Sequence, residues 1–195
     1  DIDKSMEFYK KLTMLSIDNK NILLDRAELL KRQRQFENAI KMYESALDDS
    51  TNPRMYVDIL ISIGQLQSEL NRPDEAIKSL NFAISKAKTL NDSLYSGQLI
   101  SAMILLGDVY INQKYNTQDS LAIYKQAENL IKYQNAMSEK MSDLYLKMAN
   151  CYRIMGDFDM ASKALEAIPP NYRSAITEAK IAWIQGDIFY SMGDF

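Results

Sequence analysis

Residues that could carry chemistry are scarce in this chain of 195 residues. Histidine is absent, which removes the commonest general base and the commonest metal ligand. The single cysteine, Cys151, has no histidine or second cysteine to activate it, so a buried and inert thiol is expected. No phosphate-binding glycine loop, metal-ligand spacing or serine nucleophile motif occurs. The sequence therefore predicts a protein that is not an enzyme and that uses no cofactor or metal.

Two pairs of carboxylates have the spacing of an acid/base couple, Asp48 with Asp49 and Asp157 with Asp159. Both pairs stand where turns meet helix ends, and carboxylates there accept hydrogen bonds from free backbone amides. We therefore expect these aspartates to cap helices.

The composition favours helices. Apolar residues make up 47% of the chain and charged residues 25%, with six glycines and four prolines. The net charge of −3 excludes the basic field that nucleic-acid binding needs. A short basic cluster (Lys31, Arg32 and Arg34) could meet a phosphate or an acidic partner, although a solvated helix end explains it as well.

The elements that must position any site can be inferred from an internal repeat. One anchor is a small residue within an apolar helical pattern, followed three residues later by a large one. It recurs at Ala27, Gly64, Gly107, Ala149 and Gly186. A second small anchor follows twelve or thirteen residues later, with a bulky residue four positions after it. These pairs are Ala39 with Tyr43, Ala76 with Leu80, Ser120 with Tyr124, and Ala161 with Leu165.

This pattern predicts pairs of packed helices. A small residue lets two helix backbones approach, and the bulky residue fills the adjacent space. The segments "NRPDE" and "MGDFD" lie between the two anchors and have the composition of turns. The tetrapeptide "MGDF" at 155–158 returns at 192–195, so it marks the same turn in successive pairs.

These anchors resemble the tetratricopeptide repeat. The resemblance covers about Lys20 to Phe195 and implies an all-α, right-handed solenoid of antiparallel helix pairs. Its expected repeats are 20–56, 57–99, 100–141 and 142–178, with a half repeat at 179–195. Residues 1–19 are expected to form one further helix, which either caps the solenoid or is the second helix of a preceding repeat. The first-helix anchors are 37, 43, 42 and 37 residues apart, beyond the usual period of about 34. Long repeats of this kind resemble those of bacterial regulators and sensors.

In this family the first helices line a concave groove in which ligands lie. The resemblance places the groove three residues before each first-helix anchor, and one and four residues after it. The positions expected to bind are Leu24, Glu28, Lys31, Ile61, Gln65, Ile104, Asp108, Leu146, Asn150, Arg153, Trp183 and Asp187. The apolar members replace the Lys and Asn clamp with which some relatives hold a terminal carboxylate, so an apolar or amphipathic peptide is expected. The alternative is that the protein's own helices cover this ladder. Trp183 is either an interaction anchor or a core residue.

The resulting hypothesis is a non-catalytic helical-repeat module that binds a protein or peptide of unknown identity. It would serve as the sensory or scaffolding part of a larger bacterial signalling or transcription-regulating protein. The alternative is a structural subunit that stacks through open solenoid ends, with self-association through an uncapped C-terminal end. The chain starts without Met, which favours a piece of a longer protein or a mature form. No apolar run reaches the roughly 20 residues of a membrane span. A cytoplasmic or a periplasmic location is left open.

Overall fold

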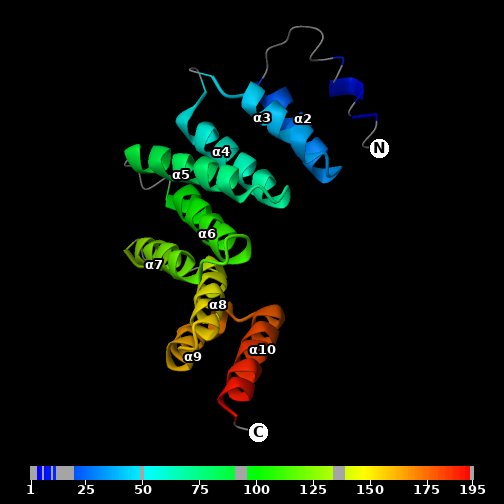
Figure 1. The fold of residues 1–195 in the computed structure, drawn as a ribbon. Coiled ribbons are helices and arrows are strands. Elements are labelled where there is room, and N and C mark those ends of the chain that lie inside the picture. Colours follow the sequence, from blue (N-terminus) through cyan, green and yellow to red (C-terminus); the bar gives the residue numbers. More distant parts are fainter. Residues whose placement is uncertain are drawn as a thin grey trace. The chain divides into compact units, whose positions relative to one another are not determined.

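The computed structural model describes residues 4, 5, 7–9, 11, 20–48, 51–90, 96–133 and 139–193. Throughout these residues the regular structure is helical (Figure 1). The helices are α2 (Lys20–Arg32), α3 (Phe36–Ser45), α4 (Pro53–Glu69), α5 (Pro73–Thr89), α6 (Ser96–Asn112), α7 (Thr117–Tyr133), α8 (Glu139–Ile154), α9 (Phe158–Glu166), the short 3-10 helix η2 (Pro170–Tyr172) and α10 (Ala175–Met192). The chain divides into two compact units, 1–102 and 103–195, and α6 begins in the first and ends in the second.

The first unit contains two helix pairs. Helix α2 packs against α3 and α4 packs against α5, and α3 in turn contacts α4 (Figure 1). The predicted hairpins are therefore present, and each is followed directly by the first helix of the next pair. The division into repeats at residues 57, 100, 142 and 179 stays a prediction, and the first helices of the later pairs begin at Pro53, Ser96, Glu139 and Ala175.

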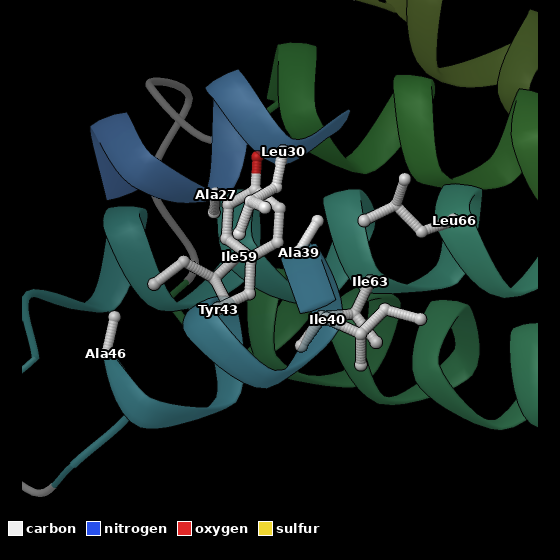
Figure 2. Close-up of a cluster of buried hydrophobic side chains, with 9 residues drawn as sticks. All are labelled: Ala27, Leu30, Ala39, Ile40, Tyr43, Ala46, Ile59, Ile63 and Leu66. Atoms are coloured by element: carbon white, nitrogen blue, oxygen red, sulfur yellow. The ribbon is translucent and has the colours of Figure 1, made fainter. Parts of the chain in front are cut away.

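The core of the first unit shows what the small anchors do. Ala27 and Ala39 are fully buried where α2 meets α3, and the ring of Tyr43 fills the space beside them (Figure 2). Ile59 and Ile63 of α4 complete the same cluster. A larger residue at either alanine would push the two helices apart, because close-packed interiors hold few voids.

The second unit repeats this arrangement. Helix α7 packs against α8 and α8 against α9, while α10 contacts both α8 and α9. Helix α6 meets α7 at Gly107, where an added Cβ would lie 2.3 Å from the Tyr124 ring. At the matching position of the first unit, a Cβ on Gly64 would lie 2.7 Å from the Leu80 side chain. Both contacts confirm that the first-helix anchor is small because a large residue of the second helix lies against it.

The turns within the helix pairs share one geometry. Arg34, Asn71 and Gly156 have positive φ, and each donates its backbone N–H to the last turn of the preceding helix at 2.9 to 3.0 Å. The residue after each also donates back, at 2.9 Å, which completes the bond pair typical of a helix end that reverses direction. The α6–α7 turn is one residue longer and has its left-handed residue at Tyr115. Gly193 ends α10 in the same left-handed conformation, which explains why "MG" recurs there.

Side chains cap several helix starts. Asp157 accepts from the backbone N–H of Met160 at 3.1 Å, so this expected cap is confirmed. Asn52 and Ser174 cap α4 and α10 in the same way. Asp48 instead accepts from the Lys20 ammonium and from the Thr51 hydroxyl, so it links the start of α2 to the loop before α4, whose N-cap is Asn52. Its sequence neighbour Asp49 lies outside the described residues, and Asp159 lies in the first turn of α9.

Part of the predicted N-terminal helix can be described. Residues 4, 5, 7–9 and 11 are helical, and the Tyr9 hydroxyl donates to Asp25 of α2 at 3.4 Å. The other residues of 1–19 lie outside the described part of the chain. Within the described ranges, no helix has both the length and the apolar character that crossing a bilayer requires.

Candidate functional site

A carboxylate one residue after the first-helix anchor marks two of the helix pairs. In the first pair, Glu28 accepts a hydrogen bond from the hydroxyl of Tyr43 on the second helix. In the third pair, Asp108 accepts from Tyr124 at 2.5 Å. Burial raises the pKa of both tyrosines well above its ordinary value, and the neighbouring carboxylate raises it further. Both phenols therefore stay neutral and act as donors.

The intervening pairs use a different combination. Where the second helix supplies Leu80 or Leu165, the matching first-helix residue is an amide, Gln65 or Asn150. A leucine offers no hydroxyl, so a carboxylate placed there would lose the hydrogen bond that compensates its partial burial. The polar residue one position after a first-helix anchor is thus an acid where the second helix supplies tyrosine, and an amide where it supplies leucine.

A lysine links two helix pairs in the second unit. The Lys147 ammonium of α8 lies 2.8 and 3.0 Å from the two carboxylate oxygens of Asp108 on α6, and 3.7 Å from Asp143. Burial lowers the pKa of Lys147, but the two carboxylates together outweigh it and leave that pKa above its ordinary value. Lys147 therefore already neutralises the Asp108 carboxylate, so Asp108 is poorly placed to form an ion pair with a ligand.

Four of the predicted site residues come together between α8 and α10. The guanidinium of Arg153 donates to Asn150 at 2.9 and 3.2 Å and pairs with the Asp187 carboxylate. It also lies 5.4 Å from the centre of the Trp183 ring, within range of a cation–π contact. Trp183 is 62% exposed, so it lies on the surface of the second unit and outside the core.

A pocket in the first unit contains two further predicted residues. It has a volume of 480 Å³ and lies between α2, α3 and α4. Leu24 and Glu28 of α2 form one wall, and Tyr43 of α3 also contributes. The wall from α4 and the loop before it consists of Asn52, Arg54, Met55, Asp58, Ile59 and Ser62.

Asp58 is the least compensated charge of this pocket. Among the described residues, no basic nitrogen lies within ion-pair distance of its carboxylate, although Gln98 of α6 donates a hydrogen bond to it. Partial burial raises the pKa of Asp58, and the nearby charge of Arg54 and the Gln98 bond only partly oppose that rise. The sequence analysis missed Asp58, Met55 and Ser62. Their spacing along one face of α4 was the available signal.

The other predicted positions are less open. Ile61, Gln65 and Ile104 are partly buried, and Lys31 lies 3.6 Å from Glu28. Leu146 is 6% exposed and belongs to the core. A second hollow, of 440 Å³, lies on α10 and is lined by Ala175, Ile176, Ala179, Lys180 and Trp183.

The described residues contain no group of three carboxylate, histidine or cysteine side chains that could hold a metal ion. Cys151 is fully buried 3.7 Å from the Ser120 hydroxyl, and burial raises the pKa of its thiol, which keeps it protonated.

Comparison with known proteins places these helix pairs in a family context. The tetratricopeptide repeat family model matches residues 142–168, which span most of α8 and all of α9. None of the curated protein sequences matches the chain.

Solved structures resemble the whole chain. BtubC from P. vanneervenii is 16% identical with a TM-score of 0.78, over 100% of this chain and 82% of BtubC. YrrB, described as a TPR protein with an unusual peptide-binding site, is 16% identical with a TM-score of 0.59, over 98% of this chain and 82% of YrrB.

A third structure is the Rap conjugation gene regulator of the plasmid pLS20, in complex with the Phr* peptide. It is 13% identical with a TM-score of 0.67, over 90% of this chain and 49% of the regulator, so this chain spans about half of that protein. At such identities the resemblance concerns the fold, and it confirms the predicted all-α, tetratricopeptide-type solenoid of helix pairs.

Proposed function

Because the chain carries a tetratricopeptide repeat at residues 142–168 and has the fold of tetratricopeptide-repeat proteins, we propose that it is a non-catalytic module that binds a peptide. The observation that carries this proposal is the pocket between α2, α3 and α4. Two of the residues predicted to line the ligand groove, Leu24 and Glu28, line this pocket, which supports the proposal.

The chemistry of the pocket suits a peptide. Leu24, Met55 and Ile59 supply apolar surface, while Asn52 and Ser62 supply groups that can donate or accept hydrogen bonds. A few polar groups within an apolar pocket fix the orientation of a ligand whose apolar atoms provide most of the affinity. Two of the similar structures, YrrB and the Rap regulator, are described with a peptide-binding site or a bound peptide.

The role of the parent protein is a further part of this proposal. A module of this kind would act as the sensory or scaffolding part of a larger bacterial signalling or transcription-regulating protein. The similarity to a conjugation gene regulator supports this view.

The test is a selection of random-sequence peptides on the immobilised chain, followed by affinity measurements with a labelled selected peptide. We expect Leu24→Ala to weaken binding about tenfold, because it removes apolar contact surface worth roughly 1.4 kcal/mol. Leu70→Ala is the matched control: both leucines are partly buried against the same core cluster, and only Leu24 lines the pocket. Failure to select any peptide, or equal binding by the two variants, would contradict peptide binding at this pocket.

A second candidate function, self-association through the C-terminal helix, is favoured by α10. Trp183, Phe189, Tyr190 and Met192 of this helix are each more than half exposed. Gly186 has nothing within 4 Å of a Cβ added to it, although the equivalent Gly64 and Gly107 lie against large side chains. The open surface of α10 around Gly186 could therefore receive a helix from a second copy.

A further inference from the structure

The pocket between α2, α3 and α4 is electrostatically unbalanced. Its lining carries two carboxylates, Glu28 and Asp58, against one guanidinium, Arg54. The two acids come from different helices, α2 and α4, so they border the hollow from two sides. Arg54 at the start of α4 is exposed, as are Glu28 and Asp58.

The charges of the second unit provide a contrast. There Asp108 is paired with Lys147, and Asp187 with Arg153, each across neighbouring first helices. In the first unit, the described partners of Glu28 are Lys31 of its own helix, at 3.6 Å, and the Tyr43 hydroxyl. Asp58 has no cation within ion-pair distance among the described residues, and its pKa is raised by burial. Among the described residues, therefore, no cation of the chain pairs with Asp58 in the way that Lys147 and Arg153 pair with carboxylates of the second unit.

The apolar lining restricts what kind of cation fits. Leu24, Met55 and Ile59 offer a small hydrated ion no oxygen ligands, so such an ion would contact only the polar side of the pocket and leave its apolar side unfilled. A lysine or arginine side chain combines an aliphatic stem, which packs on apolar surface, with a charged end group. Its stem matches the three apolar residues and its end group matches the two carboxylates.

We propose that this pocket receives a lysine or arginine side chain of the bound peptide, with its stem against Leu24, Met55 and Ile59 and its charged group at Asp58 and Glu28. This inference rests on the proposed peptide-binding function and specifies its ligand. It predicts that a basic residue flanked by apolar residues is the main determinant of recognition.

The experiment uses the full chain and random-sequence peptides displayed on phage. Selected peptides should share a lysine or arginine. In a labelled peptide, its replacement by norleucine or citrulline keeps the length of the side chain and removes the charge. We expect this change to weaken binding about tenfold, as loss of a charge-assisted hydrogen bond does.

Variants of the chain provide the reciprocal test. Asp58→Asn and Glu28→Gln should each weaken the charged peptide several-fold and leave the neutral peptide unaffected. Glu69→Gln is the matched control, because it makes the same charge change at an exposed position of α4 that lies outside the pocket. Thermal unfolding of each variant verifies that the fold is retained.

The outcomes separate the two proposals. Selected peptides that lack basic residues, yet bind in a Leu24-dependent manner, overturn the basic-residue inference and leave peptide binding standing. Enrichment of acidic peptides would indicate that Arg54 is the main charged contact of the ligand, and it would also overturn the basic-residue inference. If no peptide is selected, the proposed function fails and the inference falls with it.

Discussion

At the residue scale, the neighbours of each carboxylate decide whether it serves the fold or a ligand. Asp108 and Asp187 hold helices together through Lys147 and Arg153. Within the described part of the chain Asp58 has no such partner, and its partial burial raises its pKa more than Arg54 and Gln98 lower it. A carboxylate that lines a pocket and is not used by the fold is available to a ligand.

The pH dependence of Asp58 follows from its raised pKa. Because the folded state binds the proton more tightly than the unfolded chain, an ionised Asp58 destabilises the fold above the raised pKa. This cost is lost as the pH falls below the ordinary value of 3.8. We expect Asp58→Asn to raise the unfolding temperature slightly near neutral pH and to have no effect below pH 3.8. Thermal unfolding followed by circular dichroism measures both, with Glu69→Gln as the control. A variant less stable at neutral pH would show that Asp58 supports the fold.

At the element scale, substitution of the small anchors tests whether a neighbouring helix packs against that face of the helix. Gly107→Ala should destabilise the second unit by about 1–3 kcal/mol, because the new methyl group would overlap the Tyr124 ring. Gly186→Ala places the same methyl group in open space, so only the better helix propensity of alanine remains, a gain of about 1 kcal/mol. Urea unfolding of the two variants measures the difference. Equal destabilisation would mean that another helix covers α10 at Gly186.

The sequence was sufficient to predict the helix pairs. The spacing of small and bulky residues has a direct physical cause, visible where Gly107 meets Tyr124 and where Ala27 meets Ala39. The sequence was less informative about which residues are exposed and which line a pocket. Leu146 has the spacing of a groove residue yet is buried, because position on a helix does not say how closely the neighbouring helix approaches. Asp58 was not predicted, because the groove positions were counted from Gly64 whereas the pocket lies nearer the start of α4.

The hydroxyl–carboxylate bonds were also missed, although their signal was present. Tyrosine at the bulky position accompanies an acid in the first and third pairs, and leucine accompanies an amide in the second and fourth. Finding such a correlation requires knowing that the two positions touch. The structure provides that knowledge.

At the scale of the whole molecule, the exposed face of α10 leads to a prediction about assembly. If this face binds a second copy, light scattering should give a mass that rises with protein concentration. Phe189→Lys together with Tyr190→Glu should keep the chain monomeric, because charges on both exposed aromatics would have to be buried in the contact. Thr117→Ser, a small change on α7, is a suitable control. A concentration-independent monomeric mass for the unaltered chain would exclude this mode of assembly.

The two kinds of polar bond described above, hydroxyl bonds and ion pairs, also differ in what they would permit if the order of the helix pairs were changed. Tyr43 and Glu28 belong to the same pair, so transplanting that hairpin into another array would carry both partners along. Lys147 and Arg153 form ion pairs with residues of adjacent helix pairs, and a changed order would leave both side chains without these partners. A hydroxyl bond within a helix pair is thus kept wherever that pair is inserted. An ion pair between helix pairs is kept only when the same two pairs remain neighbours.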